Sequence, residues 1–131
     1  MLRITNEVRS DIIAHARREA PLEACGYLAE QDSVVKKHYP LTNADASAEH
    51  YSLRPEEQFA AIRQMRAAGL KLRAVYHSHP ASPARPSEED IKLAYDPEIS
   101  YVIVSLLDGQ DVVKSFTIDG PLVTAEDIEI L

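Results

Sequence analysis

The segment from Leu70 to Asp90 constrains the fold of this chain more than any other. Residues 70–76 are rich in apolar and aromatic side chains, which is typical of a buried strand, here one that ends where His77 begins. Residues 80–86 contain three prolines, which exclude a helix and favour an extended loop. A helix is predicted to begin after Ser87. The loop is long enough to bring Asp90 back toward the end of the strand.

His77 and His79 are separated by one residue. Alternate side chains of an extended segment share a face, so the two imidazoles point the same way and Ser78 points the other way. Histidine nitrogen and carboxylate oxygen are ordinary zinc ligands, and three protein ligands with one water are typical of a catalytic site. We therefore predict that His77, His79 and Asp90 bind one Zn²⁺ with a bound water, whose pKa the metal would lower toward ~7 while polarising a substrate carbonyl.

Hydrolysis at such a site also needs a general base. Glu23 is the best candidate, because it stands at the start of an apolar segment that is predicted to be a strand. Spacing along the chain does not by itself distinguish Glu23 from the other acidic residues.

A simpler interpretation exists for part of this pattern. Ser87 and Asp90 stand three residues apart, as the N-cap and third helical residue of a capping box do, and capping explains both without a metal. An isolated His-x-His pair is also more often not a ligand pair. Capping does not explain two same-face histidines just upstream, and the two roles can coexist, so the combined pattern favours a metal site.

Together these positions resemble the signature of the JAMM (MPN-plus) metalloproteases, and the small stand-alone prokaryotic type in particular. The signature positions are Glu23, His77-Ser78-His79-Pro80, Ser87 and Asp90. Residues 21–26 look like the early strand segment of that family, and residues 43–58 are similar to its middle segment. The resemblance therefore covers nearly the whole chain.

The resemblance implies a zinc-dependent hydrolase of peptide or isopeptide bonds, acting at the C-terminal Gly-Gly of a ubiquitin-like or sulfur-carrier protein. It assigns zinc to His77, His79 and Asp90. It makes Glu23 the carrier of the proton from water to the leaving amine, and Ser87 a hydrogen-bond donor to the developing oxyanion. The small size of the chain leaves little room for the insertions with which larger relatives hold ubiquitin.

Two other functional classes remain open. A non-catalytic MPN-type protein-interaction module shares the fold that the resemblance implies, but it predicts missing ligands, and every motif position is present here. A zinc deaminase uses a His-x-Glu and a Pro-Cys-x-x-Cys arrangement, whereas this chain has one cysteine.

Composition is consistent with a small enzyme without identifying it. The length of 131 residues fits one domain, residues 1–131, and a formal net charge of -7 argues against nucleic acid as a partner. No stretch is apolar enough for a membrane span or a signal peptide, and the single Cys25 fits a reducing cytoplasm and a packed core thiol. The oligomeric state stays open.

The patterns along the chain alternate between strands and helices. We expect helices from Asn6, as N-cap, to about Ala20, from Pro55 to about Ala68, and from Glu88 to about Tyr95. Strands are expected at residues 2–5, 27–28, 33–41, 70–76, 101–106 and 112–118, the second and third of them forming a hairpin. This order predicts a single-domain α/β sandwich, and the resemblance implies a cytidine-deaminase-like curved mixed sheet flanked by helices.

The remaining histidines and one arginine are weaker candidates for the site. His15 is expected to be solvated or partly buried, and His38 and His50 have no partner at metal spacing. His50 precedes the second helix and could border the cleft. Arg85 stands in the loop between the predicted ligands, where contact with substrate and simple solvation are both open.

Overall fold

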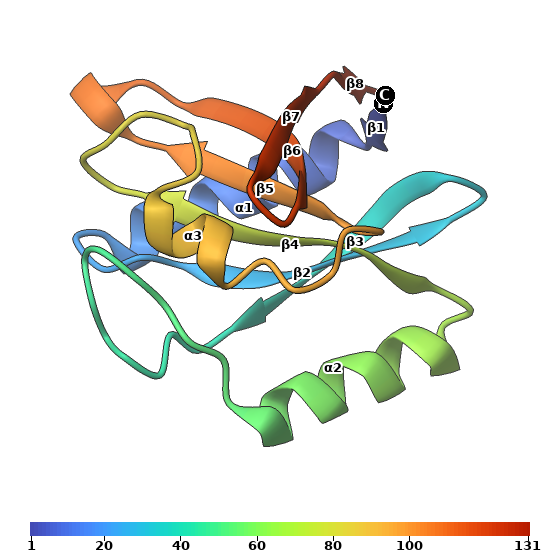
Figure 1. The fold of residues 1–131 in the computed structure, drawn as a ribbon. Helices are drawn as coiled ribbons and strands as arrows, with labels where there is room; N and C mark the ends of the chain where they lie inside the picture. Colours follow the sequence, from blue (N-terminus) through green and yellow to red (C-terminus); the bar gives the residue numbers. More distant parts are fainter.

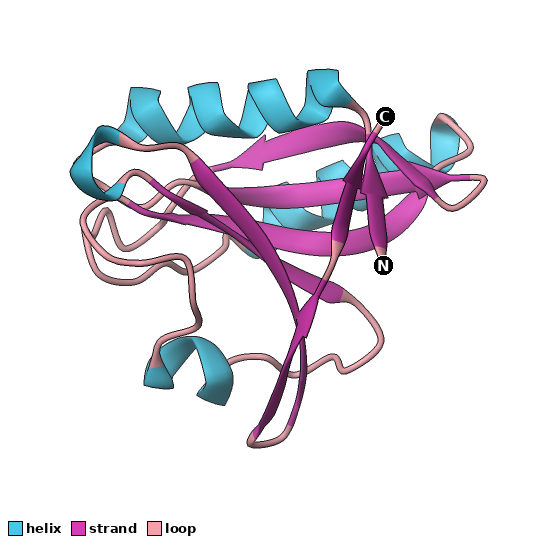
Figure 2. Cartoon of the chain, turned by 90° about the horizontal axis from the view of Figure 1, so that it is seen from above, coloured by secondary structure: helices cyan, strands magenta, loops and turns pink.

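The strands form one eight-stranded mixed sheet in the computed structural model, which describes all residues from Met1 to Leu131 (Figure 1). The strands are β1 (Leu2–Ile4), β2 (Cys25–Gln31), β3 (Val34–Leu41), β4 (Lys71–His79), β5 (Ser100–Ser105), β6 (Val112–Asp119), β7 (Leu122–Glu126) and β8 (Ile128–Ile130). Their order in the sheet is β7-β6-β5-β4-β2-β3-β1-β8. Because β7 and β8 are consecutive in the chain yet lie at opposite ends of this order, the sheet nearly closes on itself (Figure 2).

Helices cover both faces of the sheet. They are α1 (Asn6–Glu19), α2 (Pro55–Ala67) and α3 (Glu88–Lys92), with a 3₁₀ turn at Leu107–Gly109. Along β2, Leu28 belongs to the core under α1, whereas Tyr27 and Ala29 belong to the core under α2. Successive strand residues point to opposite faces, so one strand contributes to both cores. This arrangement confirms the predicted α/β class with a mixed sheet, while the likeness to cytidine deaminases stays a prediction. No helix is long and apolar enough to cross a membrane.

Several predicted boundaries were wrong. The first helix is capped by Thr5 and not by Asn6, because the Thr5 hydroxyl accepts the backbone N–H of Val8 at 3.2 Å. The fourth strand does not end where His77 begins; it continues through His79, because it pairs with β2 on one side and with β5 on the other. The third helix ends at Lys92, and β2 already begins at Cys25.

The sequence analysis missed β7 and β8. Both are short and none of their residues is fully buried; β7 (Leu-Val-Thr-Ala-Glu) lacks the alternation of apolar and polar residues that marks a strand, and the three residues of β8 are too few for their alternation to indicate one. They form through partners that are distant in sequence: β8 pairs in parallel with β1, with Leu2 opposite Ile128. Both ends of the chain therefore belong to the same sheet.

Gly26 in β2 provides a test of this packing, because there is no room for a side chain at its position. A Cβ atom at Gly26 would lie 2.5 Å from the Tyr39 carbonyl oxygen and 2.5 Å from the Tyr76 ring. We expect Gly26→Ala to lower the free energy of unfolding by about 3 kcal/mol, as overpacking of a core does, measured by urea denaturation. The control is Gly109→Ala, which has φ +71° but no atom within 4 Å, and should cost only about 1 kcal/mol. Equal losses in the two variants would contradict the close packing at Gly26.

Candidate metal centre

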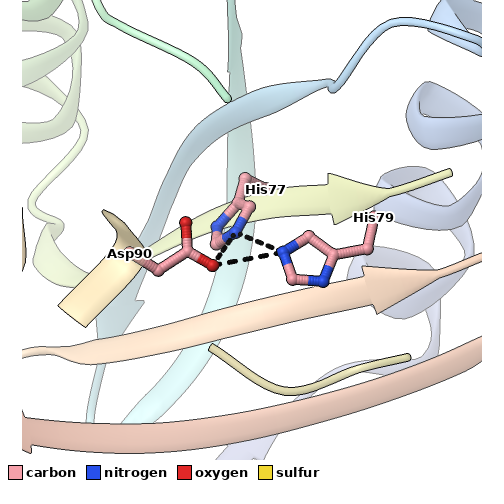
Figure 3. A group of neighbouring side chains, drawn as sticks. All are labelled: His77, His79 and Asp90. Carbon is pink, nitrogen blue, oxygen red and sulfur yellow. Dashed lines mark hydrogen bonds and ion pairs between the residues drawn. The ribbon is translucent and has the colours of Figure 1, made fainter. Parts of the chain in front are cut away.

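Three side chains from two elements meet at one point, as Figure 3 shows. His77 and His79 lie at the end of β4, and Asp90 lies in the first turn of α3. The Nε2 atoms of the two imidazoles are 3.1 Å apart, and they lie 3.1 Å and 3.2 Å from Oδ2 of Asp90. The two histidines share a face of the strand, as the alternation of side chains predicts, and the loop does bring Asp90 back to them.

This geometry suits a tetrahedral metal ion. Ligands about 2.1 Å from a tetrahedral zinc ion lie about 3.4 Å from one another, which is close to the three separations observed. The Nδ1 atom of His79 is 2.9 Å from the Pro83 carbonyl oxygen, which can only accept a hydrogen bond. In the neutral imidazole the proton is therefore on Nδ1, and Nε2 presents a lone pair toward His77 and Asp90, as a metal ligand must.

His77 is fixed mainly by packing. The ring of Tyr51 stacks on it with centroids 4.8 Å apart and planes inclined by 28°. Only 2 % of His77 is exposed, and its Nδ1 atom is buried without a hydrogen-bond partner. Tyr51 could not be predicted as part of the site, because no local pattern connects it with a histidine 26 positions further along the chain.

The capping box predicted at Ser87 and Asp90 is confirmed. The Ser87 hydroxyl accepts the N–H of Asp90 at 3.1 Å, and Oδ2 of Asp90 accepts the N–H of Ser87 at 2.9 Å. The oxygen that receives the cap is also the one that faces both imidazoles. The helix cap therefore orients the carboxylate toward the histidines, so the simpler interpretation and the metal site are two aspects of one arrangement.

Hydrogen bonds within this group shift the pKa values of Asp90 and His79 in opposite directions. Burial acts to raise the pKa of Asp90, but hydrogen bonds from His77 and His79 outweigh it and hold this pKa well below its usual range. Burial likewise acts to lower the pKa of His79, whereas its bonds to Asp90 and Pro83 raise it overall. The carboxylate thus stays ionised and attracts positive charge to this point.

Backbone pairing places Glu23 beside the histidines. Ser78 donates its N–H to the Ala24 carbonyl at 3.0 Å, and the Ser78 hydroxyl accepts the N–H of Ala24 at 2.8 Å. Since Cys25 is the partner of His77 in the antiparallel pair, the same register puts Glu23 opposite His79. Directly opposite residues project to the same face, so Glu23 is on the side of the predicted ligands.

The Glu23 carboxyl is in an unusual environment. Only 3 % of the residue is exposed, and its Oε1 atom has no hydrogen-bond partner. Burial raises the pKa of Glu23 to about 8, although the nearby His79 opposes this shift. A buried carboxyl with a raised pKa next to a metal-binding geometry is typical of a group that transfers protons.

The loop of residues 42–54 covers this region, and the Asn43 side chain holds it in place. The amide nitrogen of Asn43 donates to the carbonyl oxygens of Glu23 at 3.1 Å and of His50 at 3.0 Å. Its oxygen accepts the N–H of Asp45 at 3.0 Å. One side chain thereby ties Glu23 to the segment that carries Tyr51. The sequence analysis noted this segment only as part of the resemblance.

The other candidates lie in different surroundings. His50 lines a narrow cavity together with Tyr51, His77 and Asp90, the position that its place before the second helix had left open, and its Nδ1 atom is 3.0 Å from Asp45. His15 is more buried than expected, because only 3 % of it is exposed and its Nδ1 atom bonds the Tyr76 hydroxyl at 2.8 Å.

The chain as a whole is similar to known proteins. Residues 5–119 match the family described as prokaryotic homologs of the JAB domain. The chain is 39 % identical over 131 residues to the CysO-cysteine peptidase of Mycobacterium tuberculosis, an alignment that covers 95 % of this chain and 90 % of that one. It is 39 % identical over 104 residues to a probable TtuB-protein conjugate cleaving protease of Thermus thermophilus, covering 79 % and 66 %.

A solved structure agrees with these matches. The solution structure of protein DSY2949 from Desulfitobacterium hafniense superposes on this chain with a TM-score of 0.91 at 43 % identity. The superposition covers all of this chain and 93 % of the other. The nearly closed mixed sheet is therefore shared between the two proteins.

Because the three side chains converge, we predict that metal binding requires each of them. We expect His77→Ala and Asp90→Ala to lose most of the zinc that the parent protein retains, measured as zinc per chain by elemental analysis. The control is His38→Ala on β3, a partly buried histidine that does not belong to the group. Unchanged zinc in both ligand variants would place the metal elsewhere.

The raised pKa of Glu23 predicts a pH dependence in the metal-free protein. Its carboxyl binds a proton more tightly in the folded state, so its contribution to stability is complete below its ordinary pKa of 4.5 and is lost as the pH rises to about 8. Glu23→Gln should therefore become more stable relative to the parent across this range, as measured by urea denaturation. Glu98→Gln, which removes an exposed charge from the loop before β5 and is not among the charges that act on Glu23, provides the baseline. If the difference in the free energy of unfolding between the parent and Glu23→Gln does not change with pH, the pKa of Glu23 is not raised.

Proposed function

Because the chain belongs to the prokaryotic JAB-domain family, the small prokaryotic branch of the JAMM proteins, we propose that it is a zinc-dependent peptidase or isopeptidase. The observation that carries the proposal is the meeting of His77, His79 and Asp90 beside the buried carboxyl of Glu23. These are the parts that metal-assisted hydrolysis needs: a site for the metal and an adjacent group that carries a proton.

The names of the relatives support a substrate class. One is named as a CysO-cysteine peptidase, and the other as a probable protease that cleaves TtuB-protein conjugates. We propose that this chain cleaves after the C-terminal Gly-Gly of a comparable ubiquitin-like or sulfur-carrier protein. Glycines suit such a site, because residues without side chains allow the backbone to approach the metal closely.

Each motif residue receives one role in this proposal. His77, His79 and Asp90 hold the zinc ion, which when bound lowers the pKa of a water, polarises the scissile carbonyl and lowers the pKa of the neighbouring Glu23. Glu23 accepts the proton that leaves the attacking water and delivers it to the nitrogen of the leaving amine. Its buried, unpartnered Oε1 atom is free for both transfers.

Ser87 is assigned to the oxyanion. Its oxygen already accepts the N–H of Asp90 as the helix cap, so its own hydroxyl hydrogen remains available to donate. One such donor, if it is held in place before the reaction, supplies about 3 kcal/mol of transition-state stabilisation. The cap fixes the position of this hydroxyl next to a predicted ligand.

The test is Glu23→Gln, assayed on a carrier protein that has one residue added after its terminal Gly-Gly. We expect the variant to keep its zinc and its fold but to lose turnover on the order of 10²- to 10⁴-fold, because it lacks a base and not a ligand. Glu98→Gln, in the exposed loop before β5, serves as the charge-matched control. Turnover at the parent's rate in Glu23→Gln would exclude Glu23 as the proton carrier, and no turnover by the zinc-loaded parent on any carrier would contradict the proposed activity.

A further inference from the structure

His50, in the loop that covers the site, forms part of the wall of the narrow cavity beside the predicted metal ligands. The same cavity is lined by His77 and Asp90, so a group bound in it lies next to the metal centre. Much of the remaining wall is apolar, including Ile103 on β5 and Ile118 on β6. A polar group that enters there loses contact with water, so it needs a hydrogen-bond partner from the protein.

Asp45 sets the orientation of the His50 ring. Its Oδ2 atom lies 3.0 Å from Nδ1 of His50, and its Oδ1 atom accepts a hydrogen bond from the Ser52 hydroxyl at 2.8 Å. Asn43 fixes the backbone at both residues, because its side-chain oxygen accepts the N–H of Asp45 and its nitrogen donates to the carbonyl of His50, each at 3.0 Å. The ring is therefore held in one orientation before a substrate binds.

The contact with Asp45 also determines which ring nitrogen of His50 is free. A carboxylate only accepts hydrogen bonds, so Nδ1 carries the hydrogen and donates it to Asp45. In the neutral imidazole Nε2 then has a lone pair, which makes it a hydrogen-bond acceptor. Nε2 has no hydrogen-bond partner in the protein, and His50 is not one of the three side chains that converge as metal ligands. Since 43 % of the side chain is exposed, this acceptor is open to a ligand.

The proposed substrate ends in glycines, which have no side chains to be recognised. Only main-chain N–H and C=O groups can therefore form hydrogen bonds with the protein at this position. In the proposed reaction the C=O group of the scissile bond faces the metal and Ser87, whereas the N–H groups of the two glycines need acceptors. An N–H group that is buried without an acceptor weakens binding. Glu89 also lines the cavity, but its side chain is exposed and no hydrogen bond orients it.

We propose that His50 is a substrate-binding residue, whose Nε2 atom accepts a hydrogen bond from a main-chain N–H of the Gly-Gly tail. Asp45 is the positioning residue that keeps Nε2 free of hydrogen. The inference rests on the proposed hydrolase function and names the group that recognises the main chain of its substrate. His50 carries no proton in the reaction and holds no metal.

The first experiment removes the donor and the acceptor in turn. A carrier protein that ends in Gly-Gly-Ala is prepared with amide bonds throughout and in two further forms, in which an ester oxygen replaces the N–H of the first or of the second glycine. The Gly–Ala bond stays an amide in all three. We expect one ester to lower the kcat/KM of the parent about tenfold, mainly through KM.

His50→Phe keeps a ring of similar size without the acceptor. It should cleave the all-amide substrate with a kcat/KM about tenfold below that of the parent, and the same ester should cause no further loss, because the hydrogen bond is already absent. The control is His38→Phe, which removes a histidine that also lies beside a carboxylate, Asp11 at 3.5 Å, but outside the narrow cavity. This control should respond to the ester as the parent does, and both variants should keep their zinc.

The second experiment measures binding without turnover. The histidine ¹⁵N NMR signals of the zinc-loaded parent are followed during titration with a peptide that ends in Gly-Gly, and with the same peptide carrying the ester. We expect the amide peptide to move the Nε2 signal of His50 upfield, as accepting a hydrogen bond does, and the ester peptide to move it less. In Asp45→Asn the free protein should contain both tautomers of His50, because the carboxylate that selects one of them is gone.

The outcomes separate this inference from the function. If the parent cleaves the all-amide substrate, but both esters act equally on the parent and on His50→Phe, the role of His50 is wrong while the hydrolase function stands. Loss of zinc in His50→Phe would also overturn it, because His50 would then be a metal ligand. Failure of the parent to cleave the all-amide substrate would count against the function itself. The titration then decides the role of His50 alone, and an unchanged Nε2 signal, or equal movement with both peptides, would overturn it.

Discussion

The pairing of the start of β2 with the end of β4 is the contact on which the rest of the site depends. The two hydrogen bonds between Ala24 and Ser78 fix the register that puts Glu23 opposite His79. A shift of one residue would turn Glu23 to the face under α1 and separate the base from the histidines. β4 lies between β2 and β5, and pairing with β5 at Ile103 and Ser105 holds His77 and His79 in extended backbone, so their side chains share one face.

The site also depends on the exclusion of water, which the loop of residues 42–54 provides. Asn43 ties this loop to the backbone of Glu23, and the loop in turn lays Tyr51 against His77. In such a poorly hydrated environment electrostatic interactions are stronger, which explains the opposite pKa shifts of Glu23 and Asp90. Burial also raises the pKa of the Cys25 thiol to about 12, so this neighbour of His77 stays protonated and does not compete as a ligand.

The sequence was most informative where the constraints are local. The alternation of His77 and His79, the prolines of the following loop and the cap at Ser87 act over a few residues, so they could be predicted and were placed correctly relative to one another. Glu23 was a candidate base because it stands at the start of an apolar segment, and the resemblance supported it. Its place beside the histidines could not be predicted, because it depends on a pairing between segments 54 residues apart, Ala24 and Ser78. Tyr51 and the short strands β7 and β8 are placed by tertiary contacts, and the few residues of each strand carry too short a pattern to predict it from the sequence.

The central claim is that two histidines and one aspartate of this chain hold a zinc ion that is accessible to substrate. The most direct measurement is X-ray absorption at the zinc edge of the zinc-loaded protein. The account predicts two imidazoles and only nitrogen or oxygen ligands at about 2.0–2.1 Å, four in all, with the fourth supplied by solvent. A sulfur ligand, which would have to come from Cys25, or a zinc ion without imidazole in its coordination shell, would contradict it.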